Sequence, residues 1–175
     1  LRAEIARLEA HRQDRGEDRR LADTPLLVTI IAIVHYNDKQ LPEQRAALYK
    51  SCVHVLLAET HHAKGEARHE LEDYGGNEED KRELLTLLAF QMMSAGEKSG
   101  RTASEATLKS WLRPRVVRRR GETEANKVLR EFLRAMAERG SLLNERDRVY
   151  EFIHLSFQEY LCATYLAHEL PDTAA

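Results

Sequence analysis

Apolar residues recur along this chain three or four positions apart, in segments separated by polar stretches. This spacing places the apolar side chains of each segment on one face of a helix. The stripes are Leu26, Leu27, Ile30, Ile31 and Val34; Leu48, Cys52, Val55 and Leu56; Leu84, Leu85, Leu88 and Met92; Leu108, Trp111 and Leu112; and Val128, Leu129, Phe132, Leu133 and Met136. The pattern predicts a mainly α protein.

The first stripe is the most ambiguous, because its β-branched residues also permit a buried strand. Thr24 can cap a helix, and Pro25 suits the first helical position, where a missing N–H costs nothing. We therefore favour a helix. Pro42 followed by Glu43 repeats this signal, with proline in the first turn and an acid near the positive end of the helix dipole. The two helices are expected to form a hairpin across the polar turn 36–40.

Start and stop signals divide the second half of the chain. Thr102–Glu105 and Ser156–Glu159 have the spacing of capping boxes, which predicts a helix after each. Pro114 is expected to end the first of these helices, and Pro171 the second. Gly140 is expected to close the helix between them.

A strand pattern interrupts the helices near the end of the chain. Residues 141–143 and 148–153 flank the polar turn 144–147, which predicts a β-hairpin. Helices followed by a hairpin and a closing helix are typical of a winged-helix-like module. The expected fold is therefore mainly α, a helical hairpin subdomain followed by a winged-helix-like helical subdomain with one short β-hairpin.

Four regions follow from these signals. We expect a helical subdomain over residues 1–59, a glycine-containing loop or linker over 60–79, a winged-helix subdomain over 80–170 and a tail over 171–175.

Composition narrows the class of protein. The chain has 175 residues, 42% of them hydrophobic and 32% charged, with a formal net charge of -2. Such a chain can build a core and carries no global attraction to nucleic acid or anionic membrane. Cys52 and Cys162 lie in apolar helical patterns and are expected to be small buried hydrophobes rather than a disulfide. No apolar run approaches the roughly 20 residues of a membrane span. A cytoplasmic location is expected.

The strongest candidate for chemistry is His154. It ends the second strand of the predicted hairpin, directly before a helix, and helix N-termini favour anions. An imidazole can donate a hydrogen bond to a phosphate and titrates near physiological pH. The alternative is a packed histidine held by a backbone carbonyl. The apolar residues after it are expected to be core side chains that hold His154 in place: Phe157, Tyr160, Leu161 and Tyr165.

Two further clusters are weaker candidates. Residues 59–70 contain histidines and glutamates, but the spacing of His61, His62 and His69 matches no common zinc pattern, so no metal is expected. Arginines gather at positions 113–120, after Trp111: Arg113, Arg115, Arg118, Arg119 and Arg120. They are compatible with a solvated face, with a partner or interdomain surface, or with DNA binding by a winged helix. No catalytic constellation is evident.

Two motifs carry a family resemblance. Residues 150–161, with the sequence YEFIHLSFQEYL, resemble the end of the winged-helix domain in NACHT-type NTPases. Residues 21–27 (LADTPLL) followed by 41–49 (LPEQRAALY) resemble the first helical domain of the same family, in the same order. This family belongs to the STAND class of signalling ATPases, which includes animal NOD-like receptors and bacterial antiphage proteins.

The resemblance implies a nucleotide switch. In that family the proline of the first motif packs on the adenine of ADP, and the residue that matches it here is Pro25. The histidine of the second motif contacts the ADP β-phosphate and holds the closed, inactive state, which implies this role for His154. The resemblance further implies an upstream P-loop domain, homo-oligomerisation on activation, and a role in innate immunity or antiviral defence.

The chain also departs from the family. It has no Walker A loop and no Walker B strand, so it cannot build the phosphate cradle or the magnesium site by itself. We therefore expect no enzyme activity and no cofactor for the isolated chain. ADP or ATP with Mg²⁺, and NTPase activity, are expected of the full-length parent. The alternatives are a winged-helix DNA-binding regulator and a helical protein-interaction module without a ligand.

Overall fold

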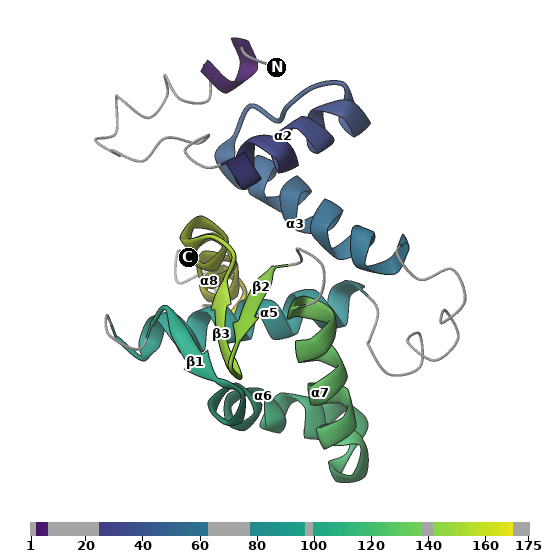
Figure 1. Ribbon diagram of the computed structural model, residues 1–175, viewed down its shortest axis with the longest axis vertical. Coiled ribbons are helices and arrows are strands. Elements are labelled where there is room, and N and C mark those ends of the chain that lie inside the picture. The colour runs from purple at the N-terminus through teal and green to yellow at the C-terminus, as the bar shows by residue number, and fades with distance from the viewer. Residues whose placement is uncertain (1–2, 7–24, 63–77, 97–99, 138–141, 170–175) are drawn as a thin grey trace, which may run out of the picture. The chain divides into compact units, whose positions relative to one another are not determined.

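The computed structural model describes residues 3–6, 25–62, 78–96, 100–137 and 142–169 (Figure 1). It divides into two compact units, Leu1–Leu56 and Leu57–Ala175, and each unit is considered on its own.

The first unit contains helix α2, Pro25–Asp38, and the beginning of helix α3, Arg45–His62. The helical interpretation of the first stripe is confirmed. Its described apolar residues are at most 2% exposed: Leu27, Ile30, Ile31 and Val34. Pro25 occupies the first helical position, as expected, and its carbonyl accepts a hydrogen bond from Thr29 Oγ1 at 2.9 Å. Thr24, the expected cap, lies outside the described residues.

The prediction for Pro42 is wrong. Leu41 and Pro42 are not helical, and α3 begins three residues later, at Arg45. The proline ring disfavours the α conformation of the preceding Leu41, so the chain stays non-helical here after turning at Lys39, whose φ is 63°. The stripe of α3 is buried at Leu48, Cys52 and Leu56.

Both ends of the expected loop over residues 60–79 are helical. Helix α3 continues to His62, and helix α5 already begins at Glu78. Residues 63–77, including His69, lie outside the described residues.

The second unit has the order helix, strand, two helices, hairpin and helix. Its elements are α5 (Glu78–Ser94), β1 (Thr102–Ser104), α6 (Glu105–Arg120), α7 (Glu122–Ala137), β2 (Leu143–Arg146), β3 (Val149–Phe152) and α8 (Leu155–Glu169). This order is that of a winged helix, so the predicted mainly α fold with a winged-helix subdomain is confirmed. The hairpin exists, and β1 adds a third strand that the sequence did not predict.

The three strands form one antiparallel sheet with β3 in the middle (Figure 1). Thr102 pairs with Glu151 and Ser104 with Val149, and on the other side Leu143 pairs with Phe152. The backbone N–H of Glu105 also donates to the carbonyl of Arg148 at 2.9 Å. Near its end, β3 is paired on both sides, because Glu151 is opposite Thr102 of β1 and Asn144 of β2.

Helices α5 and α8 pack against each other and form much of the core of this unit. Leu85 and Leu88 of α5 and Phe157 of α8 are fully buried. Near the other end of α8, the rings of Phe90 and Tyr165 stack with centroids 4.6 Å apart and an interplanar angle of 21°.

Both ends of α6 differ from those that the sequence predicted. The cap is Ser104, whose Oγ accepts from the backbone N–H of Thr107 at 3.2 Å, whereas Thr102 belongs to β1. Pro114 lies inside the helix rather than at its end. It is exposed, and the buried residues Leu112 and Val116 on either side keep the helix intact despite the missing N–H. Gly121, with φ of 82°, forms the C-cap.

The turn of the hairpin also differs from the prediction. Residues 144–146 extend β2, and the turn is formed by Asp147 and Arg148, whose φ angles are 54° and 61°. Positive φ at both central residues is typical of the two-residue type I′ turn, which matches the twist of the strands. This conformation suits Asn-Gly better than Asp-Arg.

Arg148→Gly is expected to raise the free energy of unfolding by about 1 kcal/mol, because glycine adopts this positive φ without a Cβ penalty. Urea unfolding at fixed pH measures the change. Arg146→Gly is the matched control, since Arg146 lies in β2, where glycine weakens a strand. A loss of stability in both variants would contradict the prediction.

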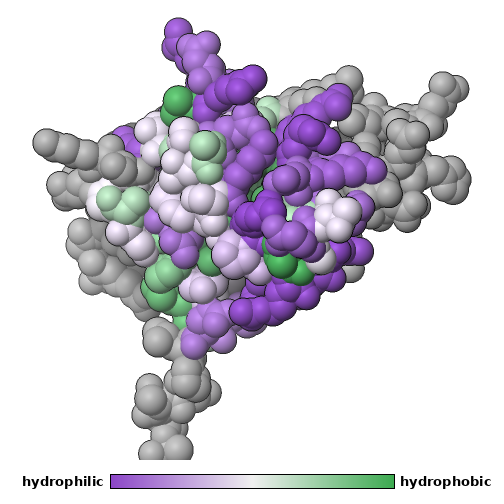
Figure 2. Space-filling model, turned by 90° about the horizontal axis from the view of Figure 1, so that it is seen from below, coloured by the Kyte–Doolittle hydropathy of each residue, from purple (hydrophilic) through white to green (hydrophobic). Residues whose placement is uncertain are grey.

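The described surface carries few large exposed apolar residues. The exposed ones are Val28, Tyr36, Met93, Val149 and Leu166, at 38–75% exposure. Figure 2 shows small, separated hydrophobic areas among mainly hydrophilic residues on one face. No helix among the described residues is long and apolar enough to cross a membrane.

Candidate functional site

His154 lies in the short connection between the end of β3 and the start of α8. Its Nδ1 accepts a hydrogen bond from the backbone N–H of Ser156 at 3.2 Å, and its carbonyl accepts from the N–H of Phe157 at 3.1 Å. The first N–H groups of a helix have no partner within the helix, so His154 satisfies two of them. His154 is thus the N-cap of α8.

The predicted cap role of Ser156 is therefore wrong. Ser156 is the second residue of α8 and is buried, and its backbone N–H donates to the histidine. The capping-box pattern predicted the wrong cap, because the His154 imidazole, two residues earlier, accepts the N–H bond that a serine hydroxyl was expected to accept.

The residues after His154 form its support. Phe157 and Leu161 are buried, as expected of core side chains, at 0% and 1% exposure. Tyr160 and Tyr165 are half-buried, and Tyr165 makes the ring stack with Phe90. Packing and capping together fix the first turn of α8, so the imidazole is held at a defined place on the strand-to-helix junction.

Gln158 is a structural residue of this site that sequence reasoning missed. Its side chain is 2% exposed, and its Nε2 donates to the carbonyl of Gly100. The N–H of Gly100 in turn donates to the carbonyl of Gly96 at 2.6 Å, after the end of α5. A Cβ on Gly100 would lie 2.8 Å from that carbonyl oxygen, so the position requires glycine. The sequence does hold one signal for this role: Gln158 is a polar residue between Phe157 and Leu161, which are both expected to be buried.

Pro25 is exposed at the start of α2. It belongs to the first unit and His154 to the second, so each is placed only within its own unit.

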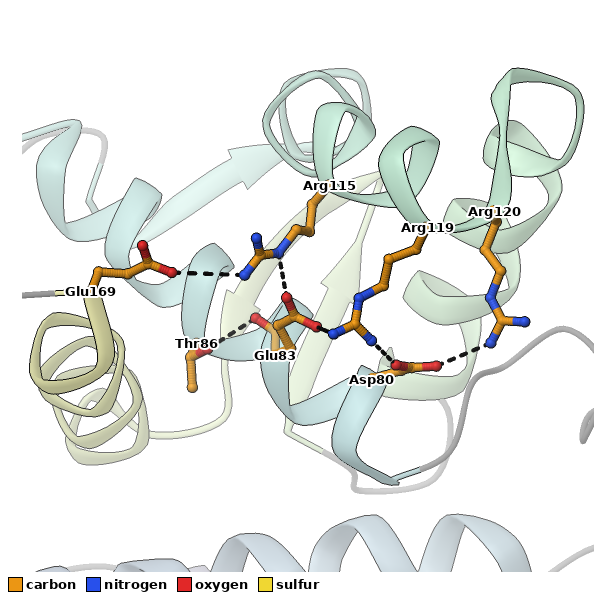
Figure 3. Close-up of polar contacts among 7 residues, drawn as sticks. All are labelled: Asp80, Glu83, Thr86, Arg115, Arg119, Arg120 and Glu169. Carbon is orange, nitrogen blue, oxygen red and sulfur yellow. Dashed lines mark hydrogen bonds and ion pairs between the residues drawn. The ribbon is translucent and has the colours of Figure 1, made fainter.

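The arginine cluster is engaged within the second unit (Figure 3). Asp80 of α5 accepts from Arg119 and, at 3.0 Å, from Arg120. Glu83 of α5 accepts from Arg115 and, at 2.6 Å, from Arg119. Arg115 also reaches Glu169 at the end of α8, at 3.7 Å. The cluster therefore joins the end of α6 to α5 and α8.

Charge in this network is balanced. The three arginines that Figure 3 labels face three carboxylates. Arg113, nearer the middle of α6, pairs with Glu122 and donates to Asn126 Oδ1 of α7 at 2.5 Å. Arg119 and Arg120 remain 48% and 47% exposed within these ion pairs, so the described part of the cluster is a solvated face crossed by ion pairs inside the unit.

The remaining candidates are possible metal ligands and the two cysteines. Among the described residues, no group of three histidine, cysteine or acidic side chains is arranged to hold a metal ion. Cys52 and Cys162 are free and buried, as expected. Burial raises the pKa of the Cys52 thiol to about 12 and also raises the pKa of Cys162, so neither is an activated nucleophile.

Comparison with known proteins gives a family for most of the chain. Neither a curated protein nor a solved structure matched the chain. Residues 45–166 match the family model of the winged helix-turn-helix domain C-terminal to NACHT. The match begins where α3 begins and extends into the last turns of α8, and it covers more than half of the chain. The chain therefore belongs to the family of winged helix-turn-helix domains that lie C-terminal to NACHT domains.

Proposed function

We propose that this chain is the regulatory part of a NACHT-type signalling NTPase. In the resting state, His154 donates a hydrogen bond to the β-phosphate of ADP, and Pro25 packs on the adenine. The upstream NACHT domain supplies the Walker A and Walker B residues, the Mg²⁺ site and the hydrolysis, because this chain contains neither motif. Family membership supports the upstream domain.

The observation that carries the proposal is the placement of His154. The imidazole lies at a helix N-terminus, where anions are favoured, and both the capping bond and the buried Phe157 hold the turn that presents it. A preorganised donor loses little entropy when it meets a phosphate.

The energetics suit a switch. A hydrogen bond to a charged group contributes roughly 1.5–3 kcal/mol, which corresponds to a population shift of about 10- to 150-fold between two states. The hydrogen bond to ADP is made in the closed state and not in the open state. ADP therefore binds the two states with different affinity, which is what a ligand-driven switch requires. Release of the winged helix then permits oligomerisation in innate immune or antiphage signalling.

His154→Ala in the parent protein is expected to weaken retention of ADP by about 10- to 150-fold, or to raise basal signalling, because the phosphate loses its donor. Nucleotide content after gel filtration measures the retention. His168→Ala is the matched control, since His168 is an exposed histidine in the last turn of the same helix. The proposal would be refuted if His154→Ala kept the same ADP content and the same basal activity as both His168→Ala and the unsubstituted protein.

DNA binding is the second candidate, and the charges of the second unit disfavour it. In a winged helix, the second helix of the helix-turn-helix enters the major groove, and α7 takes that position here. Three acids and three basic residues balance each other along α7: Glu122, Glu124, Glu131, Lys127, Arg130 and Arg134. The arginines of α6 that would otherwise supply positive charge are mostly paired with acids.

A further inference from the structure

Residues 3–6 are helical, and the side chain of Glu4 connects them to the helical hairpin of the first unit. Glu4 Oε1 accepts a hydrogen bond from the backbone N–H of Leu41 at 3.2 Å, and Glu4 Oε2 lies 3.1 Å from Nε2 of His35. His35 is in the last turn of α2, and Leu41 is in the connection between α2 and α3. One carboxylate therefore joins residues 3–6 to both parts of the hairpin.

The connection between α2 and α3 needs an acceptor at Leu41. The chain turns at Lys39, whose φ is 63°, and Leu41 lies outside both helices, so its N–H makes no bond within a helix. Leu41 is 8% exposed, and a buried N–H without an acceptor opposes folding. Glu4 supplies this acceptor from a position 37 residues earlier in the chain.

His35 holds the other oxygen of the same carboxylate. The side chains of Glu4 and His35 are 27% and 32% exposed, so their contact is partly shielded from water. When the imidazole is protonated, the two groups form an ion pair. Contact at Oε2 restricts rotation of the carboxylate and keeps Oε1 directed at the N–H of Leu41.

We propose that residues 3–6 are a strap that holds the α2–α3 connection in its conformation, with Glu4 as the group that fastens it. Family membership places a NACHT domain upstream, so the chain coming from that domain passes through residues 3–6 before it reaches α2. Displacement of the strap removes the acceptor of the Leu41 N–H and loosens the connection between the two helices. The strap is thus a conformational link between the upstream domain and the hairpin, and it does not depend on the proposed nucleotide contact.

Hydrogen exchange at the Leu41 amide tests the strap in the parent protein. Glu4→Ala removes the acceptor, and we expect it to speed exchange of this amide by about 3- to 10-fold, as the loss of one hydrogen bond predicts. Glu4→Gln keeps an acceptor oxygen for the N–H and should have a smaller effect. Glu43→Ala is the matched control and should have none, because Glu43 is an exposed acid of the same connection.

His35→Ala completes a double-mutant cycle with Glu4→Ala. It should speed exchange at Leu41 by itself but add nothing once Glu4 is replaced, since both residues act through one carboxylate. Core amides of α2, such as that of Ile30, should keep their protection in every variant, because the strap acts on the connection and not on the hairpin core.

Four results would overturn the strap. In the first, Leu41 exchanges no faster in Glu4→Ala than in Glu43→Ala. In the second, Glu4→Gln is as fast as Glu4→Ala, so the acceptor is not what matters. In the third, the effects of Glu4→Ala and His35→Ala multiply, so the two residues act separately. In the fourth, Ile30 loses protection by the same factor as Leu41, which would indicate a general loss of stability.

Discussion

Gln158→Glu is expected to destabilise the chain by about 3 kcal/mol near neutral pH, and by much less in mild acid. The wild-type amide is 2% exposed and donates to the carbonyl of Gly100. A carboxylate there cannot donate, faces a carbonyl oxygen, and loses its hydration. Both the unsatisfied carbonyl and the buried charge oppose folding.

The pH dependence follows from the introduced carboxyl. Burial raises its pKa in the folded state above the unfolded value of about 4.3. Below that value both states are protonated, and the neutral acid can donate its O–H to the Gly100 carbonyl. As pH rises through the folded pKa, this stabilising contact is lost and the penalty grows to a plateau. The variant should therefore be closest to wild type in acid.

Urea unfolding of wild type and variant across this pH range checks the prediction. Gln158→Leu removes the donor without adding a titratable group, so its penalty, about 1–3 kcal/mol, should not follow the same pH curve. Glu159→Gln also changes the charge of one residue by one unit, but at the neighbouring exposed position, so it should lack the pH-dependent penalty of a buried carboxylate. A pH-independent penalty for Gln158→Glu would show that the amide is not held as the structure indicates.

Helical periodicity was sufficient to place most of the helices, because burial on one face follows directly from spacing. Local signals for the ends of helices, such as possible caps and prolines, were less reliable. Thr102 has the spacing of a cap but belongs to β1, where pairing with Glu151 decides its conformation. Pro114 was expected to end α6, but buried neighbours on both sides outweigh one lost hydrogen bond.

The candidate site, too, could be predicted only in part from the sequence. His154 was found from its position before a helix and from the family motif, whereas its capping role depends on χ angles that no sequence pattern encodes. Gln158 and Gly100 are 58 residues apart. Asp80 and Arg119 are 39 residues apart. Such contacts exist only after the chain has folded, so local patterns could not reveal them.

Phe157→Ala is expected to cost about 3–5 kcal/mol, the largest effect of any single substitution considered for this chain. Its side chain is 0% exposed, in the first turn of α8, and its N–H donates to the carbonyl of His154. Removing the ring leaves a cavity in the core of the unit, and a core built by packed elements collapses only partly. Native stabilities of about 5–15 kcal/mol leave little reserve after such a loss.

Phe157→Leu separates packing from the backbone contacts. It keeps most of the apolar volume and all of the backbone hydrogen bonds, so it should cost far less than Phe157→Ala. Urea unfolding gives the two free energies, and native-state hydrogen exchange shows where protection is lost. Because α8 packs directly on α5, Phe157→Ala should lower the protection of amides in both helices together, whereas a loss confined to the first turn of α8 would mean that this turn opens independently of the core. In that second case the imidazole of His154 would be carried by a locally mobile turn, and the preorganisation on which the nucleotide contact depends would be absent.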